Sequence, residues 1–406
     1  MTNREAAIRI VRRLRAAGYE ALLAGGCVRD MLLRRAAKDH DVVTNARPEE
    51  IKQVFRWTLE IGAKFGVVVV RAGGQQIEVA TFRTEEGYTD GRHPDRVEYA
   101  DARADAMRRD FTINGMFYDP VKRRVIDLVG GKADLRRRLL RTIGDPNERF
   151  GEDYLRMLRA VRFAVQLDFE VDPATWQAVT VHAGRIRQIS GERIAIEVEA
   201  ILTHPRRGRG AAMLVESGLA GSIFPGFGGE QAKMGAGVVA SLPERVDFAL
   251  ALAALLGAVR TESAMLYLEG LRLSNAHAKQ VRFLMEGRGV LADGSMPLAQ
   301  LKTLVASPYF RDLYELHRAL FIVHGEPLTE LVQIRRRAEA IAEKDIKPRP
   351  LLNGHELIAL GVQPGPTVGL VAQEMYVAQL GETITTAEEA RQWVRRWLAN
   401  HKDTHK

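Results

Sequence analysis

Two aspartates separated by one residue, Asp39 and Asp41, have the clearest chemical potential in this sequence. If they lie on a strand, the alternation of side chains places both carboxylates on one face, where they can share metal ions. Oxygen ligands suit Mg²⁺, and two such ions close together activate an attacking hydroxyl group and neutralise a leaving pyrophosphate. The pair therefore predicts a magnesium site for nucleotidyl transfer. Taken alone, the same pattern is more often a surface turn or a helix cap.

A glycine turn precedes the aspartates. Gly25 and Gly26 stand before a short basic helix that we expect to begin at about Val28, and backbone N–H groups at the start of a helix bind phosphate. Arg29 adds a guanidinium group on the same side. The alternative is a tight strand-to-helix turn with an ion pair between Arg29 and Asp30. That alternative explains the glycines but not the aspartates that follow.

Glu78 is a candidate for a third carboxylate. It lies inside the apolar run Ile77–Phe82, where a carboxylate is unfavourable unless it faces a cation or solvent. Two interpretations stay open. Glu78 belongs to the same site as the aspartates, or it lies on the exposed face of an edge strand.

A double arginine begins the segment Arg108–Gly115. Arg109 is a candidate for binding phosphate through its guanidinium group. Asp110 and Asn114 follow in the same segment and are further candidates for nucleotide binding.

The stretch from Phe150 to Phe163 is predicted to form a single helix. Four polar residues recur along it at spacings of about three and form a polar stripe: Asp153, Arg156, Arg159 and Arg162. For this stretch alone, an amphipathic surface helix with an Asp–Arg pair is the favoured interpretation.

The elements around these residues are those of a mixed α/β domain. Apolar residues recur at helical spacing from 4 to 17. The predicted strands are Tyr19–Leu23, Asp39–Val43, Val67–Arg71 and Ile77–Phe82. After Leu128 the strand-like runs nearly vanish, and helix-period segments continue to the end of the sequence. The predicted fold class is α+β, with an N-terminal mixed α/β head of a small sheet and helices, followed by an all-α neck, body and tail.

Glycine and proline clusters at 224–229 and 347–350 interrupt the helical part. Phe248–Val259, the longest uncharged apolar run, is too short to cross a bilayer and is typical of a buried core helix. We expect four domains, namely a catalytic head at 1–137, a helical neck at 138–200, a helical body at 201–300 and a helical tail at 301–406.

The charge balance indicates the class of partner. There are 59 Lys and Arg residues against 51 Asp and Glu residues, a formal charge of +8, which is typical of proteins that bind nucleic acid or a membrane surface. The clustering of arginines beside the acidic motifs favours nucleic acid.

The single cysteine, Cys27, excludes an internal disulfide and a cysteine-based zinc site, and its neighbours indicate a small packed residue rather than a nucleophile. Because the N-terminus lacks the pattern of a secretory signal, we expect a cytoplasmic protein without a membrane span.

Together, these motifs closely resemble the family of class II CCA-adding enzymes and bacterial poly(A) polymerases, within the DNA polymerase beta-like nucleotidyltransferase superfamily. The order of five motifs carries the resemblance: Gly-Gly-x-Val-Arg-Asp at 25–30, Asp-x-Asp at 39–41, Arg-Arg-Asp-Phe-Thr-Ile-Asn at 108–114, Glu-Asp-x-x-Arg at 152–156 and Gly-Glu-Arg-Ile at 191–194. The similarity covers about residues 20 to 200, with weaker similarity at 352–354 and 361–366.

The resemblance implies template-independent addition of CCA to the 3′ end of tRNA from CTP and ATP. It implies that Asp39 and Asp41 hold the catalytic Mg²⁺ ions. Contacts to the triphosphate would come from the glycine turn, Arg29 and Arg109, and further nucleotide or phosphate contacts from Arg159 and Arg162. The body and tail would bind tRNA by phosphate and shape contacts. No protein partner is implied.

The resemblance also implies that Asp153 and Arg156 select the base. A carboxylate accepts a hydrogen bond from the exocyclic amino group of cytosine or adenine, and a guanidinium group donates to a ring nitrogen or carbonyl. Uracil and guanine carry a carbonyl at the amino position, which would leave the carboxylate of Asp153 facing another acceptor.

Several products share this active site. The polar, glycine-bearing segment within 83–108, with Gly87–Pro94 at its centre, matches the flexible loop by which relatives switch from C to A addition, and so favours complete CCA addition. The alternatives are a partial CC- or A-adding tRNA nucleotidyltransferase and a poly(A) polymerase. An inactive RNA-binding protein is the alternative of another class, and the intact acidic and arginine motifs argue against it.

Overall fold

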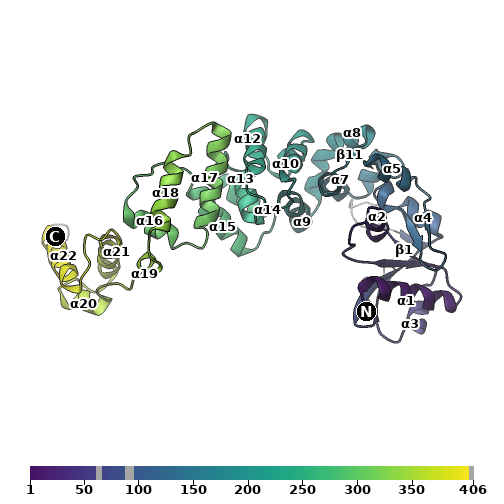
Figure 1. The fold of residues 1–406 in the computed structure, drawn as a ribbon, viewed down its shortest axis with the longest axis horizontal. Coiled ribbons are helices and arrows are strands. Elements are labelled where there is room, and N and C mark those ends of the chain that lie inside the picture. The colour runs from purple at the N-terminus through teal and green to yellow at the C-terminus, as the bar shows by residue number, and fades with distance from the viewer. Residues whose placement is uncertain (61–65, 87–95, 402–406) are drawn as a thin grey trace. The chain divides into compact units, whose positions relative to one another are not determined.

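The structure of the chain, a computed structural model, describes residues 1–60, 66–86 and 96–401 (Figure 1). Within these ranges the chain forms two compact units. The first is Met1–Lys233 together with Leu266–Leu273, and the second is Met234–Met265 together with the chain from Ser274 onward. The centre of the predicted switching loop, Gly87–Pro94, lies outside the described residues. The division into four domains stays a prediction.

The described part of the first unit contains a seven-stranded sheet with the order β3-β4-β5-β2-β1-β8-β9. The strands are β1 (Ala21–Ala24), β2 (Asp41–Thr44), β3 (Thr58–Glu60), β4 (Val67–Ala72), β5 (Gln75–Thr81), β8 (Phe117–Asp119) and β9 (Arg124–Ile126). β2 and β5 are parallel, and the other neighbours are antiparallel. β6 (Arg83–Glu86) and β7 (Arg96–Tyr99) form a separate antiparallel ribbon. The predicted mixed head is confirmed.

The first helix, α1 (Asn3–Ala16), packs on the sheet with its apolar stripe. Its N-terminus is closed by a capping box, in which the Thr2 hydroxyl accepts from the Glu5 backbone N–H and the Glu5 carboxylate accepts from the Thr2 N–H. The buried residues of α1 are Ala6, Ala7, Ile10, Val11 and Leu14, the stripe that the sequence predicts. Two further helices of the head, α3 (Pro48–Val54) and α4 (Ala102–Met107), precede β8 and β9 in the sequence.

The strand that carries the paired aspartates begins later than predicted. β2 starts at Asp41, and Asp39 lies in the connection before it. The cause is the neighbouring strand, because Ala24, the last residue of β1, pairs with Asp41. A residue before Asp41 therefore has no strand partner on β1. The prediction that strand alternation aligns both carboxylates is wrong for Asp39.

The turn after β1 is sharper than predicted. Gly25 has a φ of 73° and a ψ of −135°, a conformation that glycine reaches at little cost. The chain reverses at this one residue, so α2 (Gly26–Leu32) begins at Gly26 and not at Val28. β1 likewise begins at Ala21, two residues later than the predicted Tyr19.

Helices dominate the chain after β9, as predicted. In the first unit they are α5 (Gly131–Arg137), α6 (Pro146–Glu152), α7 (Leu155–Leu167), α8 (Pro173–His182), α9 (Gly191–Leu202), α10 (Arg207–Glu216) and α11 (Leu219–Ile223), with the 3-10 turns η2 (Thr112–Asn114) and η3 (Ala183–Gln188). Two short strands, β10 (Leu139–Leu140) and β11 (Glu170–Val171), pair in parallel among these helices.

Later helices complete the two units. They are α12 (Gly229–Ala240), α13 (Phe248–Leu255), α14 (Thr261–Gly270), α15 (Asn275–Glu286), α16 (Leu298–Val305), α17 (Phe310–His324), α18 (Thr329–Glu339), α19 (Glu343–Ile346), α20 (Gly354–Ala359), α21 (Pro366–Leu380) and α22 (Ala387–Asn400). Every residue of α13 is buried, which confirms the predicted core helix. Within the described residues, no helix is long and apolar enough to cross a membrane.

The end of α14 belongs to the first unit although it comes late in the sequence. A Cβ added at Gly191 would lie 2.0 Å from the carbonyl oxygen of Gly270, so the two backbones touch. Nearby, Arg272 forms an ion pair of 2.9 Å with Glu192, and the Tyr267 hydroxyl donates to the Pro225 carbonyl over 2.7 Å. These contacts attach residues 266–273 to α9 and to the turn after α11.

Candidate functional site

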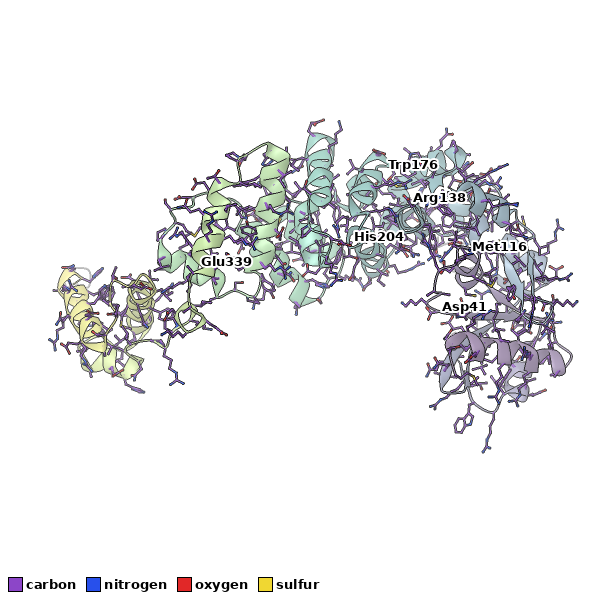
Figure 2. The ribbon with its side chains drawn as sticks, in the orientation of Figure 1. Asp41, Met116, Arg138, Trp176, His204 and Glu339 are labelled. Carbon is purple, nitrogen blue, oxygen red and sulfur yellow. The ribbon has the colours of Figure 1, made fainter. Side chains whose placement is uncertain are left out.

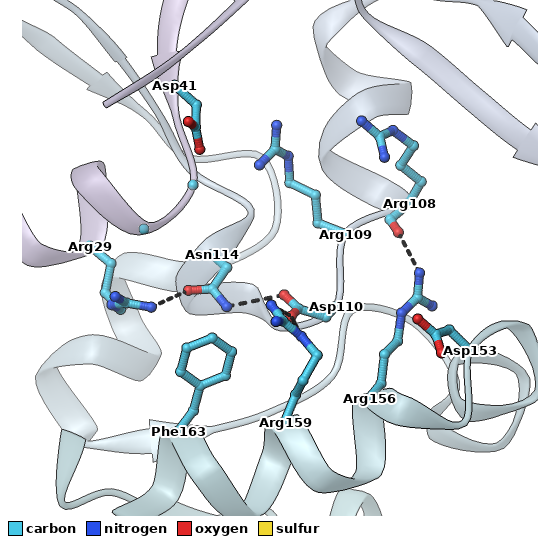
Figure 3. A pocket seen from close by; sticks show the side chains of 12 residues that line it. Arg29, Asp41, Arg108, Arg109, Asp110, Asn114, Asp153, Arg156, Arg159 and Phe163 are labelled. Carbon is cyan, nitrogen blue, oxygen red and sulfur yellow. Dashed lines mark hydrogen bonds and ion pairs between the residues drawn. The ribbon is translucent and has the colours of Figure 1, made fainter. Parts of the chain in front are cut away.

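A cavity of about 430 Å³ lies in the first unit (Figure 3). Its lining comes from the start of α2, the start of β2, the end of α4 with the following turn η2, and the junction of α6 and α7. The lining residues are Gly25, Gly26, Arg29, Asp41, Arg108, Arg109, Asp110, Asn114, Asp153, Arg156, Arg159 and Phe163. All of them except Arg108 and Phe163 are site residues predicted from the sequence. The predicted Asp39, Glu78 and Arg162 are not among the lining residues.

Asp41, which Figure 2 labels, is the exposed first residue of β2 and lines the cavity. Partial burial raises the pKa of Asp41 to about 6, the negative charges of Glu78 and Asp39 add to the rise, and the charge of Arg109 opposes it. All three carboxylates are therefore close enough to interact electrostatically. The sequence prediction of a carboxylate group that includes Glu78 has this support.

The position of Glu78 follows from the strand register. Val42 on β2 pairs in parallel with Val79 on β5, so Asp41 and Glu78 each precede that pair by one residue. β5 lies between β4 and β2 in the sheet. The interpretation of Glu78 as a residue of an edge strand is therefore wrong, although its side chain does face solvent.

The carboxylates alone do not complete a metal site. Within the described residues, no three His, Cys, Asp or Glu side chains form a group that could hold an ion by themselves. Mg²⁺ commonly binds through one or two carboxylates and takes its other ligands from water and substrate phosphates. The donor set at Asp41 fits that manner of binding, because its carboxylate oxygens lie within the electrostatic influence of two further carboxylates, those of Glu78 and Asp39.

Arg109 lies near both the glycine turn and Asp41. A Cβ added at Gly25 would lie 3.1 Å from Arg109 Nη1, so the missing side chain leaves room for the guanidinium group. Arg109 Nη2 donates to Asp105 Oδ2 over 2.9 Å, and Arg108 Nη2 donates to Asp105 Oδ1 over 2.7 Å. Burial of Asp105 opposes its ionisation, but the charges of Arg109 and Arg108 outweigh that effect and keep its pKa below the usual value. One buried carboxylate thus orients both arginines.

A hydrogen-bonded row joins the head to α7 across the cavity (Figure 3). Arg29 Nη1 donates to Asn114 Oδ1 over 2.8 Å, and Asn114 Nδ2 donates to Asp110 Oδ1 over 3.0 Å. Arg159 Nη2 then donates to Asp110 Oδ2 over 2.7 Å. Burial works against the charge of Asp110, but Arg159 and the hydrogen bond from Asn114 lower its pKa to about 2. Asp110 and Asn114 therefore hold two of the arginines that line the cavity, Arg159 and Arg29.

The ion pair of the alternative interpretation is present at the glycine turn, and phosphate binding there stays a prediction. Arg29 Nε donates to Asp30 Oδ1 over 2.8 Å, which is the predicted ion pair. The same guanidinium group also lines the cavity through the contact with Asn114. Cys27 lies beside this turn, and burial raises the pKa of its thiol to about 11, with the charge of Asp41 adding to the rise. The Cys27 side chain is buried, which confirms the predicted packed residue.

Phe163 is a lining residue that the sequence interpretation did not include. Its ring lies 5.2 Å from the guanidinium carbon of Arg29, 5.0 Å from that of Arg159 and 4.3 Å from that of Arg162. Arg162 itself forms an ion pair of 2.6 Å with Glu197 and lies outside the cavity lining. The spacing of four between Arg159 and Phe163 on one helix is the signal that could have identified this contact.

The stretch from Phe150 to Phe163 is two helices and not one. α6 ends at Glu152, and Asp153 adopts an extended backbone with φ −145° and ψ 105°. Asp153 Oδ1 accepts a hydrogen bond of 3.0 Å from the Leu155 N–H at the start of α7. A side-chain hydrogen bond from an aspartate to the backbone N–H two residues later competes with a continuous helix, which explains the error.

The two residues predicted to select the base are held by separate partners. Asp153 Oδ2 accepts from Arg193 Nη2 over 3.0 Å, and Arg156 Nη1 contacts the Glu152 carboxylate. Only 9% of Arg156 is exposed. The interpretation of a surface helix with an Asp–Arg pair is therefore wrong. Arg193 belongs to the Gly-Glu-Arg-Ile motif at 191–194. The motif alone does not reveal its contact with Asp153, which lies 40 positions earlier in the sequence.

Two family models match the chain. The model of the "Poly A polymerase head domain" matches residues 21–141. The model of the "Probable RNA and SrmB- binding site of polymerase A" matches residues 168–228. The first match contains the glycine turn, the carboxylates and the double arginine of the cavity.

Curated proteins and a solved structure are similar along most of the chain. The CCA-adding enzyme of Streptococcus suis is 33% identical over 91% of this chain and 90% of its own length. That of Lactobacillus gasseri is 35% identical over 95% of both chains. The crystal structure of the Bacillus stearothermophilus CCA-adding enzyme in complex with CTP is similar with a TM-score of 0.79 and 27% identity, and the similarity covers 100% of each chain.

Proposed function

Because the chain belongs to the family of CCA-adding enzymes, we propose that it adds cytidine, cytidine and adenosine to the 3′ end of tRNA, using CTP and ATP and releasing pyrophosphate. The supporting observation is that one cavity is lined by a carboxylate from β2, by arginines beside a glycine turn, and by Asp153 and Arg156 at the α6–α7 junction. Nucleotidyl transfer with a choice of base needs a carboxylate to bind metal, cationic groups to bind the triphosphate, and polar side chains to recognise the base.

We propose that Asp39 and Asp41 hold Mg²⁺ and that Glu78 contributes a third negative charge beside them. The raised pKa of Asp41, caused by partial burial and then by Glu78 and Asp39, supports a cation in this position. When bound, such ions would lower the pKa of the attacking 3′ hydroxyl group and stabilise the charge on pyrophosphate.

The triphosphate would lie against the glycine turn. Neither Gly25 nor Gly26 carries a side chain that would exclude a phosphate group, although the Gly25 N–H itself donates to the Met116 carbonyl. Arg109 and Arg29 line the same cavity with their guanidinium groups. Asp110 and Asn114 are proposed to act through Arg159 and Arg29, because their polar atoms are already occupied by those partners.

The base would be selected by Asp153 and Arg156. Each oxygen of Asp153 accepts one protein hydrogen bond, and a carboxylate oxygen can accept a second. Asp153 can therefore receive the amino group of cytosine or adenine. A carbonyl in that position would face a carboxylate without a proton between them, which disfavours UTP and GTP.

The remaining assignments are also proposals. The catalytic head would cover 1–137 and the base-selecting neck 138–200, and the body at 201–300 and the tail at 301–406 would bind tRNA. A tRNA substrate supports a cytoplasmic location.

The test is incubation of the purified chain and Mg²⁺ with three tRNA transcripts that end before CCA, after the first C and after the second C. CTP and ATP are supplied separately and together. Ordered completion to CCA followed by arrest supports the proposal. Arrest after CC, addition of A alone or a long A tail would instead identify a partial enzyme or a poly(A) polymerase. Binding of tRNA without any addition would identify an inactive RNA-binding protein.

A further inference from the structure

The backbone carbonyl of Arg108 lies between two arginines of the neck. Arg149 Nη1 and Arg156 Nη2 each donate to this oxygen over 3.3 Å. The carbonyl directly precedes Arg109 and Asp110, which line the cavity from the head. A single main-chain atom of the head is therefore contacted by α6 and by α7.

Arg149 makes further contacts on both sides of this junction. Its Nε donates to the Ile143 carbonyl over 3.0 Å, and its Nη1 donates to Glu152 Oε2 over 2.8 Å. Its side chain is 13% exposed, and it is not among the residues that line the cavity. A planar guanidinium group with five donors can serve several acceptors at fixed angles, whereas the ammonium group of a lysine is a point charge on a flexible stem.

The contacts of Arg149 converge on Arg156. Arg156 Nη1 contacts the same Glu152 oxygen that Arg149 contacts, and it also donates to the main-chain carbonyl of Arg149 over 2.9 Å. Arg149 thus fixes the Glu152 carboxylate and shares the Arg108 carbonyl with Arg156. Without it, the acceptors that hold the Arg156 guanidinium group in place would be free to move.

We infer that Arg149 is a positioning residue for base selection, which acts by fixing Glu152 and the Arg108 carbonyl so that the Arg156 guanidinium group keeps one orientation. The inference rests on the proposed role of Arg156. Arg149 touches neither base nor phosphate, so its loss changes the choice between nucleotides more than the binding of the correct one.

The experiment compares Arg149→Met, Arg149→Lys and Arg156→Met in the full chain. The rate of single-nucleotide addition to a tRNA that ends before CCA is measured with CTP and with UTP, and kcat/KM is obtained for each. Arg149→Met is expected to lower the CTP-to-UTP ratio about tenfold, the size of effect that loss of charge-assisted hydrogen bonds produces. Arg149→Lys should recover little of that ratio, and a normal ratio in Arg149→Lys would show that charge alone suffices and overturn the inference.

Arg15→Met is the matched control. Arg15 is also partly buried, donates to the Ala21 carbonyl over 3.1 Å and pairs with Asp119 over 2.9 Å, but it lies on α1. The control should lose stability in thermal unfolding and keep the wild-type ratio. If the control lowers the ratio as much as Arg149→Met does, the effect is general destabilisation and the inference fails. Should Arg149→Met not fold, Arg149→Lys and the control carry the comparison.

The double variant Arg149→Met with Arg156→Met separates the possible explanations. If Arg149 acts through Arg156, the double variant has the ratio of Arg156→Met alone. Additive losses would mean that Arg149 acts independently, which overturns the inference. A changed ratio in Arg156→Met with an unchanged ratio in Arg149→Met refutes the inference and leaves the proposed function intact. Unchanged ratios in both refute the base-selecting role of Arg156 itself.

Discussion

Glu78 on β5 lies beside Asp41 on β2, because both residues directly precede the parallel pair of Val42 and Val79. The two carboxylates come from positions 37 residues apart in the sequence, and their proximity contributes to the raised pKa of Asp41 after partial burial. Like charges are placed side by side at a cost in folding energy. A bound cation would reduce that cost, so we expect binding of Mg²⁺ to stabilise this pair of strands.

Asp41→Asn should abolish addition of both CTP and ATP. Asparagine keeps the shape of the side chain but removes the charge that attracts a cation, so we expect a loss of more than about a thousandfold in turnover. Binding of tRNA, measured by filter retention, should stay within about twofold of the wild-type value, because the change is confined to the carboxylate. Normal turnover in this variant would refute the metal assignment.

Glu78→Gln tests whether Glu78 is a third carboxylate of the site or a residue without a role in the reaction. If Glu78 takes part in binding cations or in setting their field, its neutral analogue should reduce kcat by about a hundredfold and raise the Mg²⁺ concentration needed for half-maximal rate. Gln76→Ala, two residues earlier on the same solvent-facing side of β5, should leave both quantities unchanged. Equal behaviour of the two variants would remove Glu78 from the site.

Asp153→Asn should weaken the choice between CTP and UTP. The side-chain amide of asparagine can donate a hydrogen bond to the carbonyl of uracil, which the carboxylate of Asp153 cannot. We therefore expect the preference for CTP over UTP to fall about tenfold or more. Asp145→Asn is a matched control, because Asp145 caps α6 by accepting from the Asn147 N–H over 2.7 Å. A full preference for CTP in Asp153→Asn would contradict the proposed role.

Phe163→Leu should weaken the binding of both nucleotides alike. The ring contacts the guanidinium groups of Arg29 and Arg159 on the cavity side, and such contacts contribute about 0.5–1 kcal/mol each where they are partly exposed. KM for CTP and for ATP is expected to rise about fivefold, with little change in kcat or in the CTP-to-UTP ratio. Phe169→Leu makes a change of the same size at another buried position. It should lower the stability of the fold as Phe163→Leu does, but it should leave KM unchanged.

Asp110→Asn should destabilise the first unit in a pH-dependent way. The folded-state pKa of Asp110 is lowered to about 2, below the value of about 3.9 of an unfolded chain. Its charge therefore stabilises the fold fully above that unfolded value, and the contribution is lost as the pH falls through about 2. In urea unfolding at pH 7 the variant should lose roughly 3 kcal/mol, the cost of breaking a buried ion pair. The difference should shrink below pH 4, and a constant difference would rule out this cause.

Local patterns predicted much of the fold and of the site. The stripe of α1, the mixed head and the core helix α13 followed from apolar spacing. The glycine turn and Asp41 were identified from residue types whose chemistry depends on near neighbours. Their joint presence in one cavity required the resemblance to a family, because spacing alone does not bring residues 25 and 156 together.

Several of the errors share a physical cause, which is dependence on a distant partner. The late start of the strand at Asp41 is set by where β1 ends. The interior position of Glu78 is set by the pairing of β5 with β2. The contacts of Asp153 with Arg193 and of Arg159 with Asp110 join residues 40 and 49 positions apart. Helical periodicity carries no information about such pairs.

The attachment of residues 266–273 to the first unit has a consequence for the order in which the chain acquires its structure. The backbone of Gly191 meets Gly270 without room for a side chain on Gly191, and Glu192 pairs with Arg272. During synthesis these contacts cannot form until Arg272 has left the ribosome. The helix that begins at Gly191 must therefore wait, with one side uncovered, while about eighty further residues are made. A fragment that stops at Lys233 would keep that side uncovered permanently.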